Sequence, residues 1–149
     1  MHHFGSYELA HFLVSLSLVN NEGFTVHSET LNPPLEGFTV GGVYTSYAGR
    51  DLFKFAVPKT EADRLLVVNK LADVIHGCGG PEQLCQEAFF FGGWGIETTA
   101  EELYVLDVTT VHATEDEARE TARKRGQDSF GEVREYKYVN EYKTVREDI

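Results

Sequence analysis

The chain of 149 residues is long enough for one domain with its own hydrophobic core, and we predict a single domain over residues 1–149. Its 24 acidic and 13 basic residues give a formal net charge of −11, which disfavours direct binding to bare nucleic acid or to an anionic membrane. No apolar run approaches the ~20 residues of a membrane span. Two cysteines are too few for a disulfide-built secreted domain, so we expect a cytoplasmic protein.

The charge is distributed unevenly along the chain. Residues 1–113 contain 14 acidic and 5 basic residues, whereas residues 114–149 contain 10 and 8, and no lysine or arginine precedes Arg50. A negative field of this kind steers a basic partner toward the surface that carries it. We therefore expect a protein or complex with a basic surface as the partner. Acidity that serves solubility alone is the competing explanation.

The first third of the chain predicts short elements separated by turns. Residues 9–19 fit a helix or a strand equally well. Residues 24–28 and 38–44 are rich in aromatic and β-branched residues and follow turn-forming segments, which is typical of strands. We therefore expect strands in this region and leave residues 9–19 open.

A helix is predicted over about residues 60–76. Thr60 and Asp63 have the spacing of a capping box, and apolar residues recur at helical intervals after them. Gly77 is expected to supply the left-handed C-cap of this helix.

Residues 87–94 and 103–112 predict a hairpin whose second strand is apolar on both faces, as in a central strand. Asp107 lies within that second strand, and we expect it to be a buried acid, paired with an arginine of the following helix or available as a titratable functional group. The tail over residues 132–145 reads as one or two further strands.

A second helix is predicted over about residues 114–125. Thr114 and Glu117 again have capping-box spacing, and the apolar stripe is thin, consisting mainly of Ala118 and Ala122. The predicted fold class is therefore α+β, with a mostly antiparallel sheet of about 5–6 strands and two main helices packed on one face.

Two histidines, His27 and His112, lie in similar contexts, the second being followed two residues later by Thr114. Histidines of this kind on facing strands can act as general acid and base on a phosphodiester, while the hydroxyl residues hold phosphate. One alternative is therefore an enzyme acting on a nucleotide or phosphodiester through His27, His112 and Thr114. Two features weaken it, because Glu29 replaces the first hydroxyl residue and Thr114 is needed as a helix cap.

No other pattern predicts chemistry. Cys78 and Cys85, with His76 nearby, fall short of the four ligands of a structural zinc site, so we expect no metal, no cofactor and two reduced thiols in a loop. The glycine pairs lack the order and the lysine of a phosphate-binding loop. Trp94 is expected to fill the core or to floor a groove, where a small molecule or a partner could bind.

Four segments follow one another along the chain: Gly23-Phe24-Thr25-Val26 continuing to Gly37-Phe38-Thr39-Val40, then Gly92-Gly93-Trp94, then Tyr104-Val105-Leu106-Asp107-Val108-Thr109, then the helix that opens with Glu117-Ala118. In this order they resemble small accessory proteins of bacteriophages and related mobile elements. The resemblance covers roughly residues 23–45 and 90–130 and supplies no catalytic residue. It implies an inhibitor or adaptor acting on a host machine, such as a CRISPR, restriction or nucleic-acid-processing complex.

These observations favour a non-enzymatic acidic binding protein of the anti-CRISPR or anti-restriction kind, whose carboxylates imitate the phosphates of DNA. A small-molecule sponge and the phosphodiester enzyme are the alternatives, and the sequence also allows a homodimer. The residues expected to contact the partner are Glu22, Glu29, Glu36, Glu97, Glu101, Glu102 and Trp94.

Overall fold

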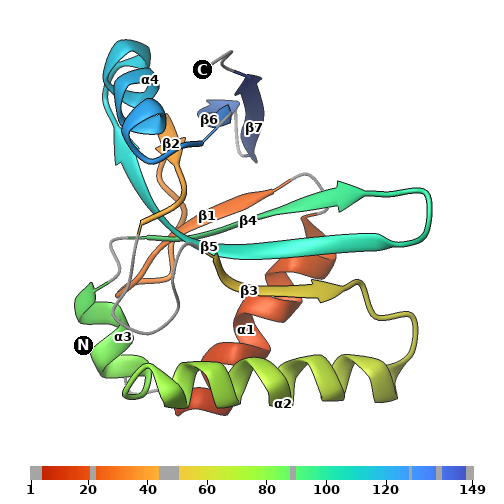
Figure 1. Cartoon of the computed structure of the whole chain (residues 1–149). Coiled ribbons are helices and arrows are strands. Elements are labelled where there is room, and N and C mark those ends of the chain that lie inside the picture. Colours follow the sequence, from red (N-terminus) through yellow and green to blue (C-terminus); the bar gives the residue numbers. More distant parts are fainter. Residues whose placement is uncertain are drawn as a thin grey trace.

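The computed structural model describes residues 5–20, 23–43, 51–87, 90–127, 129–136 and 139–146. Its strands form a seven-stranded sheet in the order β1-β4-β5-β2-β6-β7, with β3 paired to β5, and every pairing is antiparallel (Figure 1). The predicted α+β class is therefore confirmed. The elements are α1 (Ser6–Val19), β1 (Phe24–His27), β2 (Gly37–Val40), β3 (Asp51–Ala56), α2 (Glu61–Gly77), α3 (Pro81–Glu87), β4 (Phe90–Glu97), β5 (Glu102–His112), α4 (Glu115–Lys124), β6 (Ser129–Tyr136) and β7 (Val139–Arg146).

The long strand β5 joins the two parts of the sheet. One of its edges pairs with β4, while the other pairs first with β3, along residues 103–107, and then with β2, along residues 110–112. Figure 1 shows β5 running beside β3 and β4 and then curving up to β2 and α4. As predicted, β5 is a central strand and forms a hairpin with β4.

The helices of the described chain lie on one face of β5, which we call the helix face. Tyr104, Leu106 and Val108 point into the main core, which includes residues of α1, α2 and α3. Val40 lies opposite Thr110 and packs on Ala118 and Ala122 of α4, both fully buried. Since alternate residues of a strand share a face, α4 covers the same side of β5 as the other helices. The other side, the reverse face, carries Val105, Asp107, Thr109 and Val111.

The segment that the sequence left open, residues 9–19, belongs to helix α1. Its serines are compatible with a helix because each hydroxyl donates to a carbonyl one turn back: Ser17 to Leu13 and Ser15 to His11, both at 2.8 Å. Ser17 is buried without losing its hydrogen bond in this way.

Helix α2 begins as predicted and ends differently. The Thr60 hydroxyl accepts from the backbone N–H of Asp63 at 3.1 Å, which confirms the N-cap. The predicted C-cap at Gly77 is wrong, because Gly77 is still helical and the left-handed glycines are Gly79 and Gly80, at φ +90° and +94°. The Gly80 N–H reaches back to the Ile75 carbonyl at 3.1 Å and closes the last turn.

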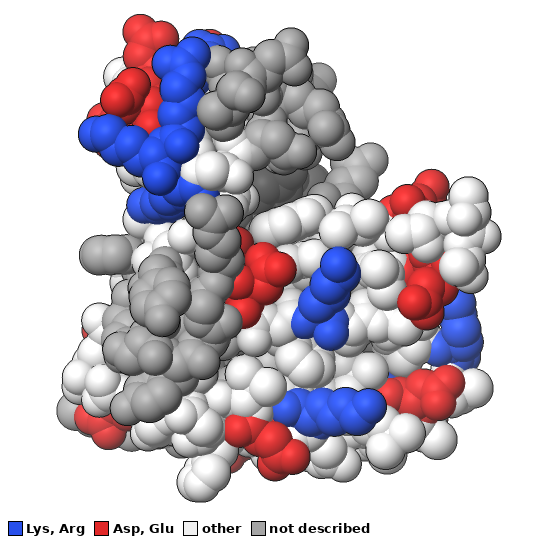
Figure 2. All heavy atoms as spheres, viewed as in Figure 1, with Lys and Arg blue, Asp and Glu red and all other residues white. Residues whose placement is uncertain are grey.

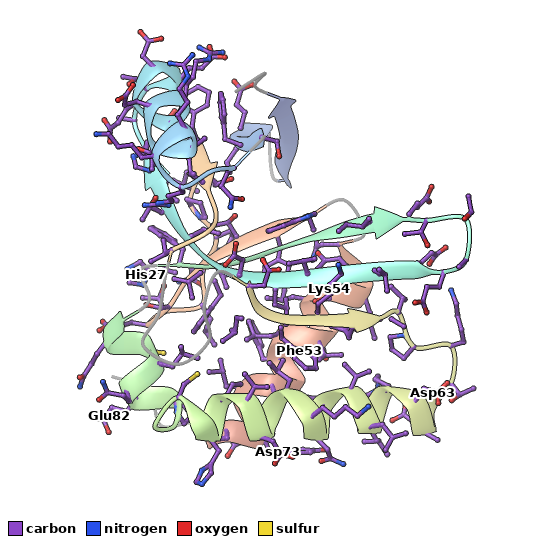
Figure 3. All side chains as sticks on the ribbon, in the orientation of Figure 1. His27, Phe53, Lys54, Asp63, Asp73 and Glu82 are labelled. Carbon is purple, nitrogen blue, oxygen red and sulfur yellow. The ribbon has the colours of Figure 1, made fainter. Side chains whose placement is uncertain are left out.

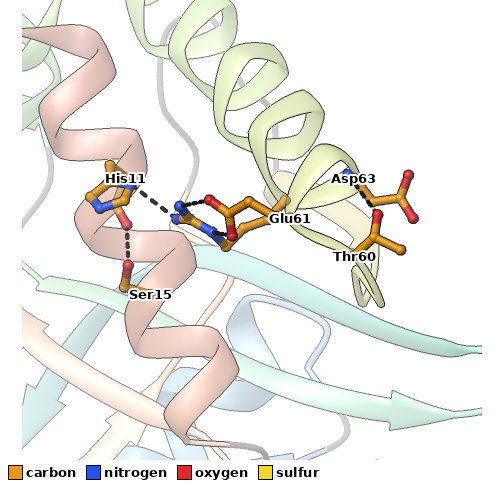
Figure 4. Close-up of polar contacts among 6 residues, drawn as sticks. His11, Ser15, Thr60, Glu61 and Asp63 are labelled. Atoms are coloured by element: carbon orange, nitrogen blue, oxygen red, sulfur yellow. Dashed lines mark hydrogen bonds and ion pairs between the residues drawn. The ribbon is translucent and has the colours of Figure 1, made fainter.

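An arginine of α2 joins this helix to α1. Arg64 binds the carboxylate of Glu61 at 2.6 Å and lies 3.1 Å from Nδ1 of His11 (Figure 4). Because Arg64 only donates, Nδ1 of His11 accepts, and the contact requires an imidazole that is unprotonated at this nitrogen. The hydrogen bond to Arg64 lowers the pKa of the Glu61 carboxyl.

Two elements were not predicted, and several boundaries moved. Strand β3 was missed altogether, and α3 occupies a segment expected to be a loop. The strand predicted from residue 87 starts at Phe90, and the one predicted over residues 38–44 is Gly37–Val40, with Tyr44 outside the described residues. The tail forms two strands, β6 and β7, as one of the predicted options. No helix in the described part of the chain is long and apolar enough to cross a membrane.

Candidate functional site

The two histidines of the enzyme hypothesis lie on opposite faces of the sheet. His27 is in register with Phe90 of β4, which is in register with Thr109, so His27 lies on the reverse face. His112 is three residues beyond Thr109, and its ring binds α4 on the helix face. The two imidazoles therefore do not face one cleft, and this geometry gives no support to a shared phosphate site.

Neighbouring side chains occupy both ring nitrogens of His112. Nδ1 lies 2.7 Å from a carboxylate oxygen of Glu117, and Nε2 lies 2.7 Å from the hydroxyl of Thr110. The Thr114 hydroxyl accepts from the Glu117 N–H at 3.2 Å, which is the predicted helix cap. His112 and Thr114 thus hold the start of α4 against β5.

The two cysteines are buried thiols. Cys78 and Cys85 are both free and buried in the main core, and the Cys85 thiol donates to the Ser28 carbonyl at 3.4 Å. Burial, together with the charge of Glu29, raises the pKa of Cys85 to about 11, so it stays protonated at neutral pH. Among the described residues, no group of three or more potential ligands could hold a metal ion.

Asp107 is a buried acid on the reverse face, 1% exposed, as the sequence indicated. Its carboxylate accepts from the backbone N–H groups of Gly42 at 2.7 Å and Val108 at 2.8 Å. Burial outweighs these hydrogen bonds and raises the pKa of Asp107 to about 7. The expected arginine is Arg125, which lowers the Asp107 pKa through its charge, while its hydrogen bonds go to the carbonyls of Val40 and Gly41.

Asp107 therefore works as a structural connection. It holds the segment after β2 against β5, at the point where the partner of β5 changes from β3 to β2. Gly41 is required here because a Cβ would lie 2.7 Å from the Asp107 carboxylate. The adjacent Thr109 hydroxyl is buried and has no hydrogen-bond partner among the described residues.

The acids expected to contact a partner are exposed but lie in separate places. Glu22 lies outside the described residues. Glu29 follows β1 at the Phe90 end of β4, whereas Glu97, Glu101 and Glu102 surround the other end, about 23 Å away along the strand. Glu36 precedes β2 beside the end of β5 and α4. In the described chain these acids are therefore divided among three separate places.

The end of the β4–β5 hairpin concentrates three of these acids, and we call it the acidic tip: Glu97, Glu101 and Glu102. Glu97 and Glu102 lie directly opposite each other, and Thr98 closes the turn by accepting from the Glu101 N–H at 3.0 Å. Lys59 binds Glu102 at 3.2 Å and leaves the other two carboxylates without a basic partner in the described chain. Figure 2 shows acidic side chains gathered at this end of the hairpin.

Lys59 was not predicted as part of this surface. It directly precedes the N-cap of α2, and only the pairing of β3 with β5 brings it to the hairpin end. Asp63, in the first turn of α2, adds negative charge on the same side of the molecule (Figure 3). Since β3 itself was missed, nothing in the sequence indicated this counter-charge.

Trp94 is half-buried rather than fully in the core. It belongs to β4, opposite Val105 on the reverse face, and its ring lies 3.7 Å from the position of a Cβ on Gly41. Its ring thus lies close to Gly41, the glycine against which the Asp107 carboxylate packs.

A hollow lies where β2, β5 and β6 meet. Its volume is about 520 Å³, and it is lined by Glu36, Gly37, Phe38, Val111, His112, Ala113, Glu132 and Val133. By strand alternation Val111 and Val133 lie on the reverse face, away from α4. The side chain of Glu36 is exposed at its rim, and the preceding Leu35 is 63% exposed.

Comparison with known proteins gives no relative from which a role could be carried over. No protein-family model, no curated protein and no solved structure matches this chain.

Proposed function

We propose that this chain is a non-enzymatic binding protein whose exposed carboxylates occupy a basic site on a larger partner. The observation that carries the proposal is that four of the expected contact residues are exposed and form no ion pair within the described chain: Glu29, Glu36, Glu97 and Glu101. Carboxylates of this kind keep their full charge for a cationic partner.

The acids of α4 provide the contrast. Glu115 binds Arg119 at 3.3 Å, and Glu120 lies 3.9 Å from Lys124 along the same helix. Within each pair the negative and positive charges largely cancel, which matches the nearly balanced charge of the C-terminal region. The excess negative charge is therefore carried by the sheet loops and the acidic tip rather than by α4.

The acidic tip supports this proposal most strongly. Like charges placed directly opposite each other on a sheet destabilise it, yet Glu97 faces Glu102 there. A pair of like charges that destabilises the sheet is expected where the charges serve to recognise a partner rather than to stabilise the fold. We propose that this surface replaces nucleic-acid phosphates at the basic site of a host defence or nucleic-acid-handling complex, in the cytoplasm of a bacterium or archaeon.

A plaque assay tests the proposal. The chain is produced in bacteria carrying an active CRISPR or restriction system, and a phage targeted by that system is plated on them. An inhibitor raises the number of plaques, and a variant with Glu97→Gln and Glu101→Gln raises it less. Plaque numbers that stay unchanged across a panel of such systems contradict the proposed function.

A further inference from the structure

The hollow beside β2 lies far from the acidic tip. Its lining combines the apolar residues Phe38, Val111, Ala113 and Val133 with His112 and two acidic residues, the exposed Glu36 and the half-buried Glu132. The volume of about 520 Å³ is in the range of ligand sites, roughly 300–1,000 Å³. It exceeds what a single ion or water molecule needs, so there is room for a group as large as a side chain.

Two features of the chain hold Glu36 at the rim. Gly37 has φ +124°, and a Cβ at this position would lie 2.8 Å from Val111 and 3.0 Å from the His112 carbonyl, so only glycine fits. Directly after Gly37, β2 pairs with both β5 and β6. The carboxylate is thus attached to a fixed part of the sheet, which reduces the ordering cost of binding.

The carboxylates at the hollow belong to Glu36 and Glu132. Glu36 is exposed and forms no ion pair within the described chain, whereas Glu132 is half-buried. The field at the hollow therefore favours a cation, and the apolar lining favours a cation with a hydrocarbon stem.

From this arrangement we propose that the hollow is a second binding site, which receives an arginine or lysine side chain from a segment of the partner protein. The stem would lie against Val111 and Ala113, and the cationic group would bind Glu36 at the rim. The exposed Leu35 next to Glu36 would meet an apolar residue of the same segment. The inference relies on the proposed function only for the basic character of the partner.

The test titrates the full chain with a capped Leu-Arg-Leu peptide and follows backbone amide shifts by NMR. The matched control peptide has citrulline, a neutral isostere, in place of arginine. We expect shifts at Gly37, Val111 and Ala113, and roughly tenfold weaker binding for citrulline, since a charge-assisted hydrogen bond is lost. Equal binding of both peptides would overturn the cationic assignment.

Three variants locate the site. Glu36→Gln removes the charge, and Ala113→Phe fills the hollow from an exposed position; each is expected to weaken binding roughly tenfold. Asp73→Asn removes one exposed carboxylate charge on α2, outside both proposed sites, and should leave the affinity unchanged. Shifts confined to the acidic tip, or unchanged affinity in both hollow variants, would overturn this inference. Neither result would contradict the proposed function, which fails only if inhibition itself is absent.

Discussion

At the scale of single residues, Asp107 links the stability of the protein to pH. Its pKa is about 7 in the folded chain and 3.8 as an ordinary carboxyl, so between these values the folded state binds more protons than the unfolded state. Its contribution to the free energy of unfolding is therefore largest below pH 4 and is lost as the pH rises through 7. The expected loss is on the order of 4 kcal/mol.

Comparing urea unfolding of the wild type and Asp107→Asn between pH 4.5 and 8 isolates this effect. The variant keeps a hydrogen bond to Gly42 but loses an acceptor for the Val108 N–H, at a pH-independent cost of about 1 kcal/mol. At low pH the wild type should be the more stable protein, and we expect the difference between the two free energies of unfolding to shrink or reverse as the pH rises. A difference that stays constant over this range would show that Asp107 does not titrate there.

Glu97 provides a second test at this scale, because it lies opposite Glu102. Removing its charge relieves a cross-strand repulsion, so Glu97→Gln should stabilise the fold by about 0.2–1 kcal/mol. Glu102→Gln should stabilise the fold by a smaller amount, because it also breaks the ion pair with Lys59. Chemical denaturation measures both changes. If Glu97→Gln destabilises the protein, the repulsion is not the dominant interaction at the tip.

At the scale of secondary-structure elements, Thr114 was considered both as the N-cap of α4 and as a phosphate-binding hydroxyl, and a substitution tests the first role. Its hydroxyl accepts from the Glu117 N–H, so Thr114→Ala should lower the free energy of unfolding by about 1 kcal/mol, whereas Thr114→Ser should not. Thermal unfolding followed by circular dichroism distinguishes the two variants. An equal loss in both would argue against the cap.

Local sequence signals predicted the capped helices well. Thr60 and Thr114 both cap the helix that follows, because capping depends on residues only a few positions apart. Helix α3 follows the turn at Gly79-Gly80, and its seven residues are too few for an apolar period to emerge. Strand β3 is ordered by its pairing with β5, about fifty residues further along the chain, which no local pattern records.

The candidate site was less predictable than the helices. Exposed acids can be recognised by residue type, but their positions depend on strand order, which places Glu29 and Glu101 at opposite ends of β4. Likewise, the His27 and His112 contexts look alike in sequence, and only the register puts them on opposite faces. The hollow beside Glu36 arises where three strands from distant segments meet.

At the scale of the whole molecule, which carries a net charge of −11, the acidic side chains fall into two groups, those paired with a basic residue and those that are not. The acids of α4 are paired along the helix, whereas Glu29, Glu97 and Glu101 have no basic partner within the described chain. If binding depends only on the net charge, neutralising any three carboxylates should weaken it equally. If binding depends on the carboxylates that have no basic partner, neutralising those three should weaken it more than neutralising three paired ones.

The most direct test of the account captures host proteins on the purified chain and quantifies them by mass spectrometry. One variant carries Glu29→Gln, Glu97→Gln and Glu101→Gln; the matched control carries Glu115→Gln, Asp116→Asn and Glu120→Gln, with the same change in net charge. We predict that the first variant loses roughly tenfold or more of a captured basic complex, while the control retains it. Equal capture by the wild type and both variants, or equal loss in both variants, would contradict the account.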